Sequence, residues 1–150
     1  MREGEANLGL AIQAYQEALR VYTFQAFPQN YAGIQNNLGN AYGDLAKVRD
    51  KEANLNLAIG AFRQALRVFI FATLPQDCAM THSNLGRAYR DLVLARLEGG
   101  AAEEAKDLWR AARNSCVEAL RVYTQEAYPE RHAALTKHLN ALDALLAETP

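Results

Sequence analysis

The sequence has few residues that interrupt helices and very few cysteines. Its 150 residues include four prolines, nine glycines and two cysteines. Two cysteines allow one disulfide at most, and they favour a reducing, cytoplasmic setting. The longest apolar run, residues 68–74, is far shorter than the roughly 20 residues that a membrane-spanning helix needs. A membrane-spanning protein and a disulfide-stabilised secreted domain are therefore not expected.

An excess of charge of one sign is also missing. Sixteen Lys and Arg residues stand against seventeen Asp and Glu residues, for a net charge of −1, and both signs are interspersed. Proteins that wrap nucleic acid or bind membrane surfaces by charge need clustered basic residues. The first five residues, MREGE, contain no apolar segment, so we expect no secretory signal there. Neither nucleic acid nor a membrane is expected as a partner.

What the sequence does contain is internal repetition, which is the first pattern to seek in a chain of this kind. Related blocks recur 47 residues apart between the first and second copies and 54 residues apart between the second and third. Several separate landmarks keep these offsets, so we interpret them as duplication. They are the LRVYT, LRVFI and LRVYT blocks at 19–23, 66–70 and 120–124, prolines 28, 75 and 129, NLGNAY and NLGRAY at 37–42 and 84–89, and EANL at 5–8 and 52–55.

The segments between these landmarks have the periodicity of helices. Alanine and leucine favour helix, and in residues 8–27 the apolar side chains recur every three or four positions. No alternating strand pattern is present. We interpret each internal proline as closing a helix, with Asn30 and Asp77 as N-caps of the helices that follow. The sequence therefore predicts an all-α protein with helices at 5–27, 30–48, 52–73, 77–98, 101–127 and 130–147.

The repeated landmarks resemble the tetratricopeptide repeat (TPR), in which the pattern L-G-x2-Y in one helix is followed by A-x3-F and then P in its partner. The residues that carry the resemblance are Leu38, Gly39 and Tyr42, their equivalents Leu85, Gly86 and Tyr89, and Ala58, Phe62 and Pro75. The resemblance implies a right-handed superhelical array of antiparallel helix pairs. It covers residues 1–150 as a single domain with sections 5–48, 52–98 and 101–147.

The glycines of this pattern have a physical reason. Gly39 and Gly86 fall where a neighbouring helix approaches closely, and a Cβ atom would obstruct it. The chain departs from the family at Gln35 and His82, which replace the usual tryptophan, and in its last helix, which lacks the Leu-Gly-x2-Tyr pattern. The long repeat is similar to a type abundant in cyanobacteria and other bacteria that often accompanies CHAT-type protease domains. This implies a regulatory part of a longer multidomain signalling protein.

The resemblance also implies a concave groove, lined by the first helix of each pair, that receives an extended peptide or protein segment. An asparagine amide can pair with both the N–H and the C=O of such a backbone. Arginine or lysine would add charge-assisted hydrogen bonds to acidic groups. The alternative is that the asparagines bond to neighbouring helices or are simply solvated. The candidates are Asn36, Asn37, Asn40, Asn84, Arg87, Arg90 and Lys137.

Enzymatic activity is not expected. Cys78 and His82 are four residues apart on one helix face, a spacing that suits a dyad or two metal ligands. However, His82 occupies a packing position of the repeat, and Cys116 replaces a buried aromatic residue. No phosphate-binding glycine loop, HExxH, CxxC or GxSxG motif is present. We expect no cofactor and no metal.

The two ends of the repeat pattern suggest a second function. The first helix lacks its pair partner and so does the last, and stacked repeats normally finish with polar caps. We therefore expect poorly covered apolar residues at both ends and either a longer natural array or a homodimer through these helices. A self-assembly module is the alternative to peptide binding. The apolar residues are Leu8, Ile12, Tyr15, Leu19, Leu135, Leu139, Leu142 and Leu146.

Overall fold

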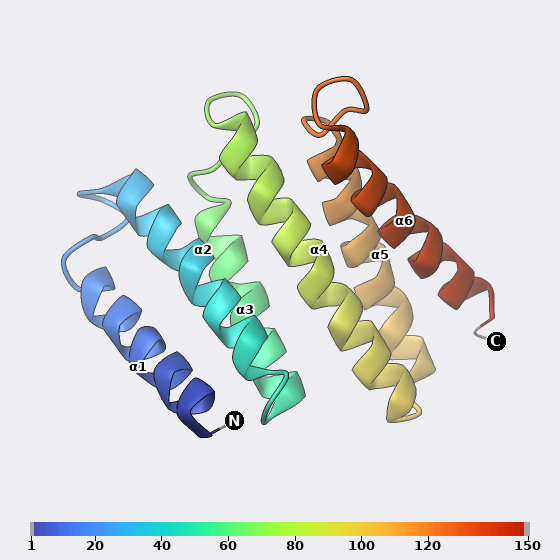
Figure 1. Cartoon of the computed structure of the whole chain (residues 1–150), viewed down its shortest axis with the longest axis horizontal. Coiled ribbons are helices and arrows are strands. Elements are labelled where there is room, and N and C mark those ends of the chain that lie inside the picture. The colour runs from blue at the N-terminus through green and yellow to red at the C-terminus, as the bar shows by residue number, and fades with distance from the viewer. Residues whose placement is uncertain (1, 149–150) are drawn as a thin grey trace. The chain divides into compact units, whose positions relative to one another are not determined.

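The computed structural model describes residues 2–148, and this part of the chain consists of helices and their connections without a strand (Figure 1). The all-α prediction is therefore confirmed. Within the same residues, no helix combines the length and the apolar character that crossing a bilayer requires. The helices are α1 (Arg2–Leu19), α2 (Pro28–Leu45), α3 (Lys51–Ala65), α4 (Pro75–Glu98), α5 (Ala102–Leu120) and α6 (Pro129–Ala147).

The chain divides into two compact units, Met1–Ile70 and Phe71–Pro150. In the first unit, α2 packs against both α1 and α3, and in the second unit α5 packs against both α4 and α6. Short connections make successive helices within each unit antiparallel (Figure 1). Each unit is thus built from helical hairpins that share their middle helix. The right-handed superhelix over the whole chain stays a prediction.

The internal prolines begin helices rather than end them, which corrects the sequence interpretation. Pro28, Pro75 and Pro129 are the first residues of α2, α4 and α6. A proline at this position loses nothing, because the first amides of a helix have no partner within it. Asn30 and Asp77 consequently lie inside the first turn, and the N-cap positions belong to Phe27, Leu74 and Tyr128.

The preceding helices are also shorter than predicted, since they end at Leu19, Ala65 and Leu120 instead of continuing to 27, 73 and 127. Two local effects account for this difference. The residue before a proline is excluded from the helical region, and Phe27 indeed has φ −138° and ψ 66°. In addition, the hydroxyls of Thr23 and Thr124 accept the backbone N–H groups of residues 26 and 127 and stabilise a turn.

The repeat glycines lie at close helix contacts, as predicted. A Cβ atom built on Gly39 of α2 would lie 2.6 Å from Cε1 of Phe62 in α3. A Cβ atom on Gly86 of α4 would lie 3.0 Å from Sγ of Cys116 in α5. Both partner side chains are buried, with 2% of Phe62 and none of Cys116 exposed. These contacts define the pairs α2–α3 and α4–α5. Of the other signature residues, Leu38, Leu85 and Ala58 are buried, and Tyr42 and Tyr89 are half-buried.

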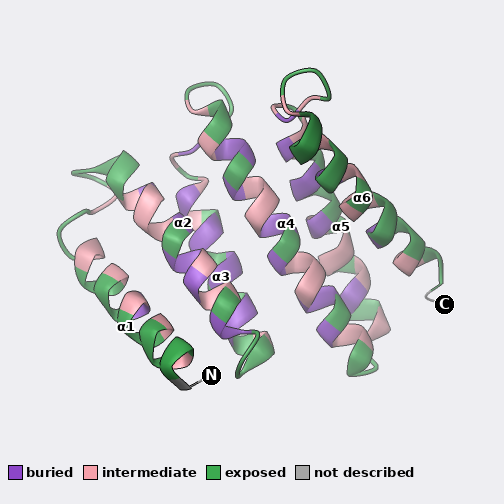
Figure 2. Cartoon of the chain, in the orientation of Figure 1, coloured by how far each residue is buried: buried purple, intermediate pink, exposed green. Residues whose placement is uncertain are grey.

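Of the eight apolar residues expected to be poorly covered at the two ends, three are buried and five are half-buried, on helices that are coloured mainly exposed and intermediate in Figure 2. Ile12 is buried in a cluster with Leu38 and Leu45 of α2, and the other named residues of α1 pack against that cluster. At the other end, Leu135 is 4% exposed and Leu142 is 1% exposed. Self-association through these helices stays a prediction.

Arginines of the repeated LRV blocks cover aromatic residues of the preceding interhelical loop. In the first unit, the Arg67 guanidinium lies 3.9 Å from the ring centroid of Phe24. In the second unit, Arg121 lies 3.9 Å from the ring centroid of Phe71. Phe24 and Phe71 are equivalent positions of the repeat, and Gln125 occupies the third. Each stack is a cation–π contact that joins one loop to the next.

Candidate functional site

A groove with a volume of about 350 Å³ lies in the second unit between α4 and α6. One residue of the loop that connects α5 with α6 also lines it. No residue of α5 itself is among the residues that line it. Those residues are Met80, Ser83, Asn84, Arg87 and Arg90 of α4, Tyr123 of the loop, and Arg131, Ala134, Leu135 and His138 of α6.

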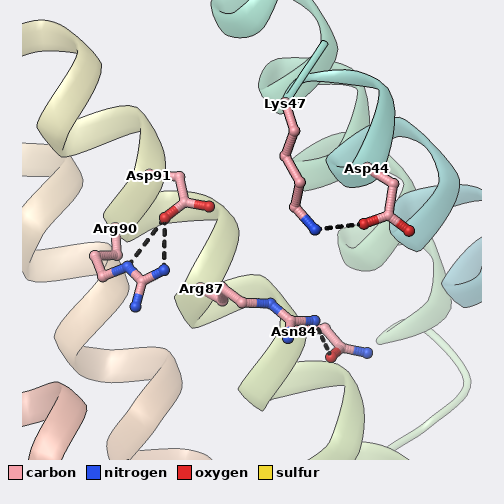
Figure 3. A network of polar contacts seen from close by, with 6 residues as sticks. All are labelled: Asp44, Lys47, Asn84, Arg87, Arg90 and Asp91. Atoms are coloured by element: carbon pink, nitrogen blue, oxygen red, sulfur yellow. Dashed lines mark hydrogen bonds and ion pairs between the residues drawn. The ribbon is translucent and has the colours of Figure 1, made fainter. Parts of the chain in front are cut away.

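Three of the predicted ligand-binding residues line this groove together. Asn84, Arg87 and Arg90 follow one another at intervals of three along α4, which places them on neighbouring turns of one face. The Asn84 Oδ1 atom accepts a hydrogen bond of 3.0 Å from Nη2 of Arg87 (Figure 3). Arg90 donates from Nε and Nη2 to Oδ1 of Asp91, at 3.0 and 2.7 Å. The α4 wall of the groove is thus an amide followed by two guanidinium groups.

The opposite wall of the groove consists of residues of α6 and of Tyr123, and the sequence did not predict these residues as a set. Arg131 of α6 donates a 2.9 Å hydrogen bond to the hydroxyl of Tyr123, and its guanidinium lies 4.8 Å from that ring's centroid. On α6, the lining residues recur at spacings of three and four, and His138 is the last of them. Sequence reasoning placed Lys137 on this wall, but Lys137 does not line the groove. The α6 periodicity starting at Arg131 is the signal that identifies the correct face.

The groove carries positive charge. Arg87, Arg90 and Arg131 line it, and none of the lining residues in the described structure is acidic. Burial lowers the pKa of His138 below its ordinary value, and the nearby Arg90 lowers it further, while Asp91 opposes the shift. Burial raises the pKa of Tyr123, against the opposing effect of Arg131. Near neutral pH, both His138 and Tyr123 are therefore uncharged, and the arginines dominate the local field.

The three candidate asparagines of the first unit have different environments. Asn36 of α2 is only 4% exposed, which favours a structural hydrogen bond over a ligand contact for this residue. Asn37 is exposed, and Asn40 is half-buried. Just beyond the end of this helix, Lys47 pairs with Asp44 of α2 at 2.6 Å across the exposed surface (Figure 3). Asn37 and Asn40 therefore remain candidates for ligand contact in this unit.

Cys78 and His82 do not form an activated pair. Cys78 is buried, and burial raises the pKa of its thiol, with a smaller contribution from Glu118. Burial lowers the pKa of His82, and its Nδ1 atom is enclosed without a hydrogen-bond partner among the described residues. A buried neutral thiol is a packing group rather than a nucleophile. Across residues 2–148, no group of three or more His, Cys, Asp or Glu side chains is placed to hold a metal ion.

Both cysteines should consequently resist thiol reagents in the native protein. Burial raises the pKa of Cys116 to about 11, and Cys116 is fully enclosed. At about pH 8 we expect neither thiol to react with Ellman's reagent on the timescale of its reaction with a free thiol. In denaturing guanidinium chloride both should react at once, which serves as the control. Rapid modification of the folded chain would show that Cys78 or Cys116 is accessible.

Comparisons of this chain with protein-family models, curated proteins and solved structures found no match. The repeat landmarks and the groove described above are therefore the observations on which a functional assignment rests.

Proposed function

We propose that the chain is a protein-interaction module of the tetratricopeptide type, whose groove between α4 and α6 binds an extended peptide or protein segment. The observation that carries this proposal is the groove itself, because Asn84, Arg87 and Arg90 were predicted as ligand contacts and line it together. Concave sites with a few convergent polar groups are the usual form of a binding site.

The helix contacts support the repeat class. Gly39 meets Phe62, and Gly86 meets Cys116, at equivalent positions of two successive repeats. Such contacts are what a helix-pair repeat needs in order to stack, since only glycine allows this approach. They support the tetratricopeptide resemblance without identifying a ligand.

The groove offers the chemistry for holding a peptide backbone. Asn84 and Ser83 supply donors and acceptors on one wall, and Met80, Ala134 and Leu135 supply apolar surface. Asn37 occupies the position equivalent to Asn84 in the preceding repeat and is exposed. A ladder of such amides would bind a ligand backbone with little regard to its sequence. Lys137 and Asn40 are peripheral candidates in this proposal.

Replacing Asn84 with alanine should weaken peptide binding about tenfold, because the backbone of the ligand loses a bidentate partner. The measurement is fluorescence anisotropy with a labelled pool of random decapeptides. Asn114→Ala is the matched control, since Asn114 is an exposed asparagine of α5 outside the groove. Circular dichroism should show equal helicity for both variants. If no peptide pool binds the wild-type chain, the proposed function is wrong.

The remaining expectations belong to the same proposal. We expect an interaction module of this kind to be a cytoplasmic, bacterial protein without enzymatic activity. It would act beside a signalling domain of a longer chain. Homodimerisation through α1 and α6 is the alternative role, and three of its eight named apolar residues are buried while five are half-buried. Light scattering of the purified chain at increasing concentration distinguishes the two roles, since only self-assembly raises the mass.

A further inference from the structure

The charges of the groove indicate which ligands it prefers. The ion pair of Arg90 with Asp91, at 2.7 Å, reduces the positive charge that Arg90 offers. The contacts described for the other two arginines are with neutral groups: Arg87 with the Asn84 amide, and Arg131 with the Tyr123 hydroxyl and two aromatic rings. Two guanidinium groups on facing walls thus keep their full charge in a partly enclosed space. Such groups are well suited to binding carboxylates.

A titratable side chain lies in the same groove. The charged groups that face His138 from α4 are Arg87, Arg90 and Asp91. On α6 itself, Arg131 also lines the groove, and α5 contributes no lining residue. The His138 Nε2 atom is buried and has no hydrogen-bond partner within residues 2–148. His138 therefore stands among cationic neighbours, where a bound anion would change its protonation most.

We propose that this groove selects peptides with acidic groups, held by Arg87 and Arg131, and that His138 takes up a proton from solvent when they bind. The inference rests on the proposed function, since it specifies the ligand of the same groove. It extends that function by naming the charge of the partner and by linking its binding to pH.

A peptide is favoured over nucleic acid for two reasons. The volume of about 350 Å³ suits a few residues rather than a helical polyanion. Nucleic-acid binding needs a series of cations along an extended surface, whereas the whole chain carries a net charge of −1. The clustered arginines of one short groove are matched to one or two carboxylates.

The direction of the pH dependence follows from the environment of His138. Burial and Arg90 hold the pKa of His138 below the ordinary value of 6.5. A bound carboxylate stabilises the imidazolium and raises that pKa, so the complex binds more protons than the free protein. Affinity should therefore rise as the pH falls through the region near and below 6.5. Ligand carboxylates stay ionised there, because their pKa is about 4.

The test uses three labelled decapeptide pools that differ only at two fixed neighbouring positions, occupied by Glu, Gln or Lys. We expect the Glu pool to bind about tenfold more tightly than the Gln pool, and the Lys pool to bind more weakly than either. Arg87→Gln and Arg131→Gln should each remove most of the preference for Glu. Arg110→Gln is the control, since Arg110 is an exposed arginine of α5 paired with Asp107. His138→Gln should flatten the pH dependence of Glu-pool binding.

The possible outcomes separate the proposed peptide-binding function from the inference that the groove selects acidic peptides. Equal binding of the Glu and Gln pools overturns the inference, while the proposed function stands if Asn84→Ala still weakens both. A loss of Glu preference in Arg110→Gln equal to that in Arg87→Gln shows general electrostatic attraction and also overturns it. The same holds if heparin competes better than the Glu pool, which would indicate a polyanion site. Absence of binding for all pools overturns the proposed function and this inference together.

Discussion

Replacing Gly39 with alanine should lower the free energy of unfolding of the Met1–Ile70 unit by about 2–3 kcal/mol. The new Cβ atom would lie 2.6 Å from the Phe62 ring, well inside contact distance. The ring is only 2% exposed, so it cannot move into solvent without separating α2 from α3. Alanine's better helix propensity offsets only about 0.5–1 kcal/mol of this effect. Urea unfolding followed by circular dichroism measures the change.

Gly33→Ala is the matched control on the same helix. A Cβ atom at Gly33 would meet no atom within 4 Å, so the substitution should stabilise α2 by up to about 1 kcal/mol. Combining Gly39→Ala with Phe62→Leu should cost less than the sum of the two single changes, because the smaller side chain relieves the clash. An equal response of Gly33→Ala and Gly39→Ala, or strict additivity, would contradict the close contact.

Replacing Leu142 with alanine should detach α6 from the second unit. The side chain is 1% exposed, and the backbone carbonyl of the same residue accepts a 2.9 Å hydrogen bond from Nε1 of Trp109 on α5. Truncating a buried leucine costs about 2–5 kcal/mol. Since α6 packs mainly against α5 among the described helices, we expect local rather than global loss of structure. Hydrogen exchange should show residues 129–147 losing protection first.

The functional consequence separates this change from general destabilisation. Because α6 supplies Arg131 and His138 to the groove, Leu142→Ala should abolish peptide binding while α4 and α5 remain protected from exchange. Leu94→Ala is the control, since Leu94 of α4 is 38% exposed and should cost less than about 1 kcal/mol. Uniform loss of protection across the whole second unit would show that α6 unfolds together with its neighbours.

The sequence predicts the helices and their contacts well but places several of their ends wrongly. Repetition and a three-to-four residue periodicity are sufficient to identify six helical segments and the close approach at Gly39 and Gly86. The errors lie in the segments before the prolines. There, helix propensity competes with two local preferences, the exclusion of Phe27 from the helical region and the turn bonded by Thr23. Propensity summed over a window does not detect such single-residue effects.

The site is predictable only where the repeat pattern is intact. On α4 the NLGRAY block gives the register, and Asn84 and Arg87 were identified from it. On α6 the pattern has decayed, so the motif does not fix the helix face that lines the groove, and the predicted contact Lys137 lies one position before the lining residue His138. Neighbouring positions on a helix point about 100° apart. The role of Tyr123 additionally depends on a loop that the sequence interpretation had made helical.

The arginine–aromatic stacks have a consequence for the gain or loss of whole repeats. Excising residues 28–74 would delete one whole period and join Phe27 directly to Pro75, leaving the same residue types at the junction. Phe24 would then precede Arg121 at the same spacing at which Phe71 now precedes it. The residues of α2 that now pack toward α1 would be replaced by the equivalent residues of α4, which are also buried. The replaced residues are Leu38, Ala41 and Leu45, and their equivalents are Leu85, Ala88 and Leu92. Recombination between repeats can therefore add or remove a whole repeat while the junction keeps the same types of residue and contact.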